Sequence, residues 1–189
     1  MKISNEKLNF VLEQNHFIYA IKDDNGLNNA INNDCKVVFV LYGTVINICD
    51  IVKALKDHNK IVFVHIDLIE GLSSKEVAVD YIANNTGADG IISTKQTLIK
   101  CASARGLLTV QRFFLIDSLA LNNLIKQIKN SPLDYIEVLP ACSTKTISKL
   151  IKLTNVPIIA SGLIQDKEDI LSALNVGAIA VSGSNFDLS

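Results

Sequence analysis

Eight short apolar segments, rich in β-branched residues, recur along the chain, and this repetition limits the possible folds more than any other feature. Each segment is typical of a buried β-strand, and the stretches between them carry apolar residues at helical spacing. The segments are residues 17–22, 36–42, 60–67, 88–93, 107–113, 134–139, 156–161 and 178–182. Strands that alternate with helices in this way predict an α/β fold.

The spacing of the segments favours a closed barrel. Successive strand starts lie about 19 to 28 residues apart, which leaves room for the helical crossover between parallel strands. Residues 61–64 are apolar on both faces, as in a parallel sheet that is covered on both sides. Eight such units favour a TIM-type (β/α)8 barrel over an open doubly wound sheet.

The length of the chain adds detail to this expectation. Its 189 residues are fewer than the roughly 250 of a typical TIM barrel. We therefore expect one compact domain over residues 1–189, in which the last helix is short or missing. Residues 4–15 carry apolar residues on one face, so they could form a leading helix that covers the bottom of the barrel.

Composition excludes several classes of protein. The chain has 18 Lys and Arg and 19 Asp and Glu, which excludes a nucleic-acid binder held by overall charge. No apolar run approaches the ~20 residues that span a bilayer, and the N-terminus lacks signal-peptide order, so we expect a cytoplasmic protein without a membrane partner. Cysteines at positions 35, 49, 101 and 142 show no metal-binding spacing. We expect buried reduced thiols and no metal or cofactor.

Small and polar residues end the seventh and eighth predicted strands. Ser161 and Gly162 end the seventh strand, and Ser182, Gly183 and Ser184 end the eighth. Carboxyl ends of barrel strands form the functional face, and glycine there lets backbone N–H groups approach an anion. The two turns therefore predict a phosphate site, although tight turns without a ligand would use the same residue types.

Ionisable residues at the ends of other strands could complete such a site. His65 and Asp67 lie two apart on the third predicted strand, so their side chains would point the same way. They could act together in proton transfer, or His65 could pack at the mouth while Asp67 caps a loop. Glu137 is expected to point into the mouth, where Lys95 or Arg112 could pair with it. Arg112 is the stronger candidate for an anion contact because its planar fork bonds bidentately, but the sequence leaves its face of the strand open.

Positive charge is concentrated in one part of the chain. Residues 90–155 carry nine Lys and Arg against three Asp and Glu, whereas the remainder carries nine against 16. Lys145, Lys149 and Lys152 share one helical stripe, and Lys126 and Lys129 belong to the preceding helix. These lysines could contact RNA phosphates or form a solvated outer face. No aromatic residue interleaves them, so base stacking is not expected.

Several strings of residues, in the same order, resemble one protein family. They are V-H-I-D-L-I-E-G-L at 64–72, D-G-I-I-S-T-K at 89–95, Q-R-F-F-L-I-D-S at 111–118, I-E-V-L-P at 136–140 and P-I-I-A-S-G-L-I at 157–164. The chain is thereby similar to the glycerol-3-phosphate-responsive antiterminators, the glycerol uptake operon antiterminator regulators of bacteria. The first and third strings are specific, whereas the Gly/Ser turns are shared with many barrels.

The resemblance implies a non-enzymatic regulator that binds glycerol 3-phosphate and then acts on the leader mRNA of glycerol-uptake genes, preventing premature termination. It assigns the family's ligand residues to His65, Asp67, Lys95, Arg112, Glu137, Ser161, Gly162, Ser182, Gly183 and Ser184. Two positions depart from the expected pattern. Ser161-Gly162 stands in place of a glycine pair, and residues 141–143 read A-C-S where a glycine is expected.

Two other functions fit the same residues. A sugar-phosphate isomerase, aldolase or phosphodiesterase could use the phosphate site with His65, Asp67 and Glu137 as acids and bases. A barrel retained as a scaffold would need no ligand. Whichever function applies, a barrel without its last helix could be covered by a second subunit, so we expect a homodimer.

Overall fold

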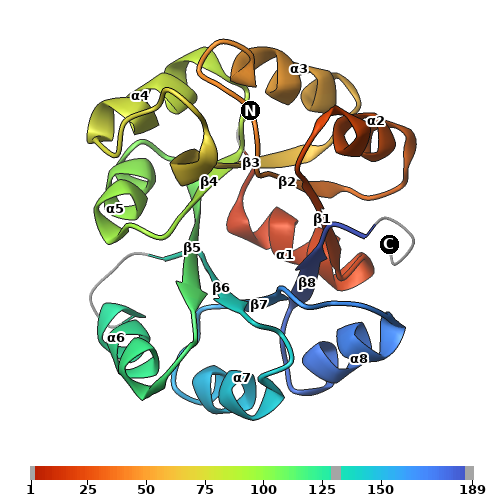
Figure 1. Cartoon of the computed structure of the whole chain (residues 1–189), viewed down its shortest axis with the longest axis vertical. Helices are drawn as coiled ribbons and strands as arrows, with labels where there is room; N and C mark the ends of the chain where they lie inside the picture. The colour runs from red at the N-terminus through yellow and green to blue at the C-terminus, as the bar shows by residue number, and fades with distance from the viewer. Residues whose placement is uncertain (1–2, 129–132, 186–189) are drawn as a thin grey trace.

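The structure, a computed structural model, describes residues 3–128 and 133–185, and it is a closed barrel of eight parallel strands. The strands follow one another around the barrel in chain order, and β8 pairs with β1 to close it (Figure 1). They are β1 (Phe17–Ile21), β2 (Val37–Val40), β3 (Ile61–His65), β4 (Gly90–Ser93), β5 (Leu108–Phe114), β6 (Tyr135–Leu139), β7 (Ile158–Ser161) and β8 (Ala180–Gly183). The expected TIM-type barrel and all eight predicted strands are confirmed.

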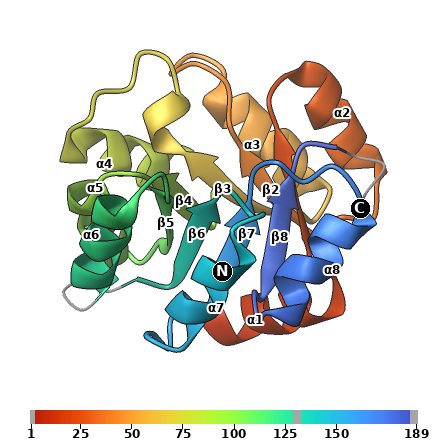
Figure 2. The same cartoon turned by 60° about the horizontal axis from the view of Figure 1, so that its bottom comes forward.

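Helices surround the barrel and connect its strands (Figures 1 and 2). They are α2 (Asp24–Asn32), α3 (Ile48–Asp57), the 3-10 turn η1 (Ile66–Leu68), α4 (Glu76–Asn85), α5 (Gln96–Ala104), α6 (Ser118–Ile128), α7 (Thr144–Ile151) and α8 (Lys167–Asn175). The structure describes two residues after β8, Ser184 and Asn185, which lie outside any helix, so the expectation of a short or missing last helix stays a prediction. Across the described ranges, no helix has the length and apolar character needed to cross a membrane.

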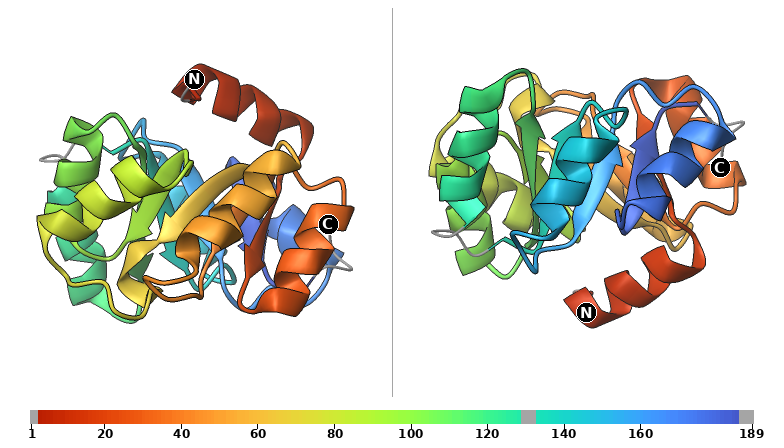
Figure 3. Two further views of the ribbon diagram at one scale, coloured as in Figure 1. Left: turned by 90° about the horizontal axis from the view of Figure 1, so that it is seen from above. Right: turned by 90° about the horizontal axis from the view of Figure 1, so that it is seen from below.

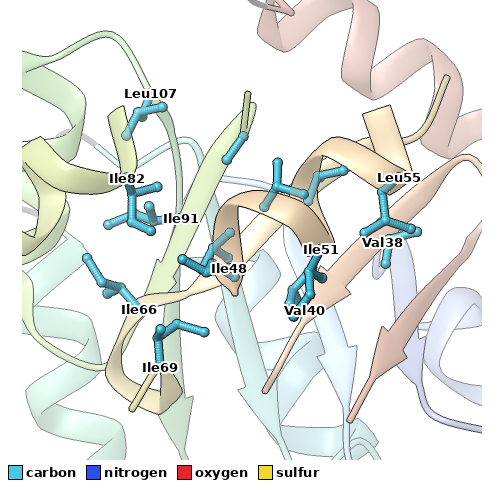
Figure 4. Close-up of a cluster of buried hydrophobic side chains, with 14 of the residues drawn as sticks. Val38, Val40, Ile48, Ile51, Leu55, Ile66, Ile69, Ile82, Ile91 and Leu107 are labelled. Atoms are coloured by element: carbon cyan, nitrogen blue, oxygen red, sulfur yellow. The ribbon is translucent and has the colours of Figure 1, made fainter. Parts of the chain in front are cut away.

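An apolar layer fills the space between the strands and the helices. Ile48, Ile51 and Leu55 of α3 are buried in the same cluster as Val38 and Val40 of β2 (Figure 4). The opposite faces of the same strands line the barrel interior, where Phe39 of β2 belongs to a separate buried cluster. Both faces of these strands are therefore buried, which explains their continuous apolar runs.

The predicted leading helix closes the amino end of the barrel. Helix α1 (Asn5–Gln14) begins after Ser4, whose side chain accepts a hydrogen bond from the first turn of the helix. Its Leu8 and Leu12 are buried in one cluster with Phe39 and Phe63 of the barrel interior. Figure 3 shows α1 lying across this end of the barrel. The bottom of the barrel is thus sealed by apolar side chains.

The four cysteines are free, but the expectation that all of them are buried is wrong for two. Cys35 and Cys101 are buried, whereas Cys49 is half-buried and Cys142 is exposed. Cys142 lies in the loop between β6 and α7, and chain connections of this kind run over the surface. Within the described residues, no three His, Cys, Asp or Glu side chains come together as a metal site.

Candidate ligand site at the carboxyl end of the barrel

The interior of the barrel changes from apolar to polar toward its carboxyl end. Val110 of β5 lies in the interior cluster, so Arg112, two residues further on, also points inward. In the parallel register, Arg112 stands beside Glu137 of β6. The neighbouring Gln111 points outward, where its amide donates a 2.6 Å hydrogen bond to Gln127 of α6. The structure thereby decides which face of the fifth strand Arg112 occupies.

Arg112 and Glu137 form a buried ion pair that extends into a chain of hydroxyl groups. The Nε atom of Arg112 donates to Oε2 of Glu137 at 2.6 Å, and Glu137 has no exposed surface. The hydroxyl of Ser182 donates to Oε1 of the same carboxylate at 2.7 Å and lies 2.7 Å from the Ser161 hydroxyl. Both oxygens of Glu137 are therefore occupied. The carboxylate holds Arg112 and Ser182 in place, and Arg112 is one of the two partners predicted for it.

A cavity of about 220 Å³ opens at this end of the barrel. Six of the ten predicted ligand residues line it, namely Arg112, Ser161, Gly162, Ser182, Gly183 and Ser184. Adjacent strands β7 and β8 bring the two predicted turns together, as their register pairs Ser161 with Ser182. The position agrees with the general rule that barrel sites form where the strands end.

The charges around the cavity favour an anion. Lys22 and Arg112 both line it. The pair of Arg112 with Glu137 is neutral as a whole, so Lys22 supplies the net positive charge and Arg112 contributes N–H donors. Within the described part of the chain, Arg112 uses only its Nε atom in that pair, so its two terminal nitrogens are left to bind a ligand. A guanidinium fork and an ammonium group together suit a phosphate.

The glycines of the two turns are also required by the fold itself. Gly162 has a φ of +74°, which is a left-handed conformation that favours glycine, and a Cβ atom there would lie 3.3 Å from Cδ2 of Leu139. A Cβ atom on Gly183 would lie 3.1 Å from Cζ of Phe17. Conformation and packing thus explain both glycines without a ligand. The evidence for a ligand comes from the cavity and its cations.

His65 is buried beside the ion pair and does not line the cavity. It ends β3, and its side chain is 3% exposed. Burial, and secondly the positive charge of Arg112, lower the pKa of His65 to about 4, so the imidazole is neutral at pH 7. Its Nδ1 atom has no hydrogen-bond partner in the described structure. His65 is therefore a neutral polar group in the top layer of the interior.

The prediction that His65 and Asp67 share a strand and point the same way is wrong. Strand β3 ends at His65, and Asp67 lies in η1, where strand alternation no longer applies. The carboxylate of Asp67 accepts hydrogen bonds from the backbone N–H of Thr94 at 2.8 Å and from the Ser93 hydroxyl at 3.1 Å. Asp67 thus caps the loop after β4, which was the alternative interpretation. Lys95 reinforces this loop, with its Nζ atom 3.8 Å from Oδ1 of Asp67.

Comparison with known proteins assigns the chain to a family. Residues 17–188 match the family model described as glycerol-3-phosphate responsive antiterminator. The chain belongs to this family. The antiterminator family is a family of regulators, so the match supports a regulatory role and confirms the resemblance drawn from the sequence strings.

Individual relatives agree with the family match. The uncharacterized protein YgcP of Escherichia coli (strain K12) is 42% identical over 175 residues, which cover 93% of this chain and 92% of YgcP. The crystal structure of the glycerol uptake operon antiterminator regulatory protein from Listeria monocytogenes str. 4b F2365 is 32% identical, with a TM-score of 0.88 over 90% of this chain and 92% of that one. A glycerol uptake operon antiterminator-related protein from Thermotoga maritima MSB8 is 33% identical, with a TM-score of 0.79 over 91% and 96% of the two chains.

Lys22 lines the cavity together with the two turns and was not among the predicted ligand residues. Lys22 directly follows β1, and β1 pairs with β8, so closure of the barrel brings Lys22 to the turn that contains Ser184. A signal was present, because Lys22 is the charged residue that ends the first apolar run.

The lysines predicted to contact RNA lie on the outer surface of the barrel wherever the structure describes them. Helix α7 buries Ile147 and Leu150, while Lys145 and Lys149 are exposed and Lys152 caps its end, also exposed. Lys126 is exposed near the end of α6, and Lys129 lies outside the described residues. Lys145 and Lys149 are thus exposed on α7 with Lys152 at its end, and the contact of these lysines with RNA stays a prediction.

Proposed function

We propose that this chain is a cytoplasmic sensor of glycerol 3-phosphate that controls transcription termination by acting on the leader mRNA of glycerol-uptake genes. The observation that carries the proposal is the cavity of about 220 Å³ in which two Gly/Ser turns meet Arg112 and Lys22. Membership of a family of glycerol-3-phosphate responsive antiterminators supports the same ligand.

In the proposed complex the phosphate group lies on the turns after β7 and β8. It accepts hydrogen bonds from backbone N–H groups there and from the Ser184 hydroxyl, and it is neutralised by Arg112 and Lys22. One glycerol hydroxyl points toward the polar top layer of the interior, which contains Glu137 and His65. The cavity is smaller than the roughly 300–1,000 Å³ of pockets for drug-sized ligands, as expected for a small metabolite.

The arrangement supports binding without turnover. A general base must lie within hydrogen-bond reach of the substrate, whereas neither His65 nor Glu137 lines the cavity, and Glu137 is paired with Arg112 and Ser182. Asp67 is occupied by Ser93 and Thr94. An isomerase, aldolase or phosphodiesterase would need an acid or base that reaches into the cavity, and these carboxylates instead hold neighbouring protein groups.

Calorimetry with glycerol 3-phosphate, followed by analysis of the recovered ligand, tests the proposal. We expect stoichiometric binding and unchanged ligand. Gly162→Asp should abolish binding because it places a carboxylate at the phosphate turn. Gly106→Asp is the matched control, since Gly106 also has a positive φ, of +69°, and its Cβ position is open. A wild-type protein that shows no heat at millimolar ligand, or that converts the ligand, contradicts the proposal.

For the RNA step we propose that Lys145, Lys149 and Lys152 of α7, with Lys126 and Lys129, contact phosphates of the leader. The ligand can change this affinity only if it binds the two states of the protein differently. Replacing Lys145, Lys149 and Lys152 with Ser should weaken leader binding and lower the slope of log K against log salt by about 3, if each lysine meets one phosphate. The control variant carries Ser at the exposed positions Lys75, Lys100 and Lys167. Equal losses in the two variants would exclude α7 as the RNA surface.

We further propose that the protein works as a homodimer, in which a second subunit packs against the barrel. Light scattering across a range of protein concentrations, with and without glycerol 3-phosphate, measures this directly. A mass of 20.6 kDa under all conditions would exclude the dimer.

A further inference from the structure

A second hollow adjoins the phosphate cavity, and its lining is apolar. This apolar groove, of about 580 Å³, lies between the residues that follow β5, β6 and β7, and its walls include Phe114, Ile116, Pro140 and Leu163. Leu139, Gly162 and Leu163 line both hollows, so these residues form the ridge between groove and cavity. A molecule seated on the phosphate turns could therefore extend directly into the groove.

The groove leaves large apolar side chains in water. Ile116 is 86% exposed, Leu163 is 66% exposed and Phe114 is 52% exposed. Contiguous apolar surface of this kind on a protein marks a binding site more often than chance placement does. Leu163 also has a φ of 57°, which is unusual for a side chain that can make no local hydrogen bond of its own. Strained conformations of this type cluster at sites that clamp ligands.

We propose that the site takes a glycerol 3-phosphate that carries one apolar chain in ester linkage, with its phosphate in the cavity and its chain in the groove. This inference rests on the proposed function and names a wider ligand class for the same site. The parts of such an ester follow the same order as the two hollows. Its phosphate meets the two cations and the two Gly/Ser turns, its ester linkage crosses the ridge, and its acyl chain lies against the apolar wall.

The continuity of the two hollows favours this ligand over other occupants of the groove. RNA is a poor match, since the groove offers one aromatic ring and otherwise aliphatic walls without a cation. A second copy of the chain would also cover the groove. A contact between two copies would not, however, explain why the groove lies directly beside the cavity proposed for the phosphate. The volume of about 580 Å³ falls within the roughly 300–1,000 Å³ of pockets that bind small molecules.

The test compares the affinities of glycerol 3-phosphate and 1-hexanoyl-glycerol 3-phosphate by calorimetry on the full chain. Each fully buried methylene contributes up to roughly fourfold in affinity, and this groove is partly open, so we expect the ester to bind at least about tenfold more tightly. Monohexanoylglycerol, which lacks the phosphate, should bind far more weakly than the ester.

Variants of groove residues show whether the tighter binding of the ester comes from the groove. Phe114→Ser combined with Ile116→Ser should bring the ester's affinity to that of glycerol 3-phosphate, and should leave the affinity for glycerol 3-phosphate itself unchanged. The matched control is Phe10→Ser combined with Val77→Ser, because Phe10 and Val77 are 63% and 64% exposed and do not line the groove. This control should keep the full gain.

The outcomes separate this inference from the proposed function. If glycerol 3-phosphate binds and the ester binds no better, the inference fails and the proposed function stands. If the ester binds and glycerol 3-phosphate does not, the inference stands and the proposed ligand is wrong. If neither binds, both fail. A gain that survives Phe114→Ser and Ile116→Ser, or a groove variant that only changes the oligomeric mass, also overturns the inference.

The chain-bearing phosphate could come from solution or from a membrane, and a second arm distinguishes the two sources. Binding of the dissolved ester identifies a free metabolite. Binding only to phosphatidylcholine vesicles that contain 1-oleoyl-glycerol 3-phosphate, lost in the groove variant, identifies a membrane-borne lipid of the same one-chain chemistry. Vesicle binding that the groove variant retains is adsorption to the surface and contradicts the inference.

Discussion

The two ends of the barrel interior are built from opposite kinds of side chain. At the amino end, Leu8 and Leu12 of α1 close an apolar cluster that includes Phe39 and Phe63. At the carboxyl end the interior holds the Arg112–Glu137 pair, with Ser161, Ser182 and His65 around it. Strands β3 and β5 to β8 contribute to both ends, because each carries an apolar inward residue followed two positions later by a polar one.

Because of this difference, one end of the interior mainly stabilises the fold and the other end is available for ligand binding. The sealed end buries apolar surface, which stabilises the fold without any further partner. The open end buries charged and polar groups that hydrogen-bond to one another. This arrangement contributes little net stability, but it fixes the positions of these side chains. Changes at the closed end should therefore affect unfolding alone, and changes at the open end should affect the ligand as well.

Removal of one member of the ion pair should have the largest effect. Glu137→Ala leaves the Arg112 guanidinium buried without its partner, so we expect a loss of about 3–5 kcal/mol in the free energy of unfolding. Urea denaturation measures this loss. The double variant Arg112→Met with Glu137→Met removes both charges and should recover most of the stability while glycerol 3-phosphate binding stays lost. A single variant as stable as the wild type would show that the pair is already solvated.

Truncation of a side chain at the closed end should affect stability without affecting ligand binding. Leu12→Ala opens a cavity among the apolar residues under α1, and we expect it to lower the free energy of unfolding by about 2–4 kcal/mol. The affinity for glycerol 3-phosphate, measured by calorimetry well below the unfolding temperature, should not change. A parallel loss of affinity would contradict the separation between the two ends.

The burial of His65 at the open end makes the free energy of unfolding of the protein depend on pH. Its pKa is about 4 in the folded protein, below the ordinary value of 6.5, so the unfolded chain takes up the proton first as the pH falls. This residue's contribution is fully present above pH 6.5 and declines between pH 6.5 and 4, by at most about 3 kcal/mol. Denaturation curves at several pH values should show the decline.

His65→Gln should flatten that part of the profile. His58→Gln, at an exposed histidine, serves as the control and should keep the wild-type slope. Because carboxylates elsewhere also titrate in this range, the quantity to compare is the difference between the two variants. Identical slopes would mean that His65 does not titrate as its burial requires.

The smallest expected effect concerns Lys22. Replacement of this residue with Met removes one exposed cation from the cavity wall, so we expect a five- to tenfold weaker affinity for glycerol 3-phosphate, or about 1 kcal/mol. The free energy of unfolding should change by less than about 0.5 kcal/mol. Lys36→Met, at an exposed lysine near the amino end, is the control. Equal affinities in the two variants would remove Lys22 from the site.

Much of the fold was predictable because its signals are local. Each strand is a short β-branched run, and each run is apolar on both faces because helices cover one side and the interior the other. The two Gly/Ser turns were predictable for a similar reason, since strand ends in a barrel converge on one face. The location of both turns in one cavity agrees with that rule.

Other features depended on exact geometry that no local pattern contains. Asp67 left the strand because β3 stops at His65 and turns into η1, a shift of two residues that redirects a carboxylate to the loop after β4. Strand boundaries are the part of a sequence-based prediction that is least constrained, because hydrophobic alternation does not mark where pairing ends.

By itself, the sequence determined the closed eight-stranded architecture, the end of the barrel that carries polar groups and, through its strings of residues, the family. Only the tertiary structure decided that Arg112 faces inward onto Glu137, that Lys22 joins the turns of β7 and β8, and that an apolar groove adjoins the cavity. The physical reason is that periodicity is a property of neighbouring residues, whereas these contacts join strands and loops that are far apart in the chain. Closure of the barrel brings them together.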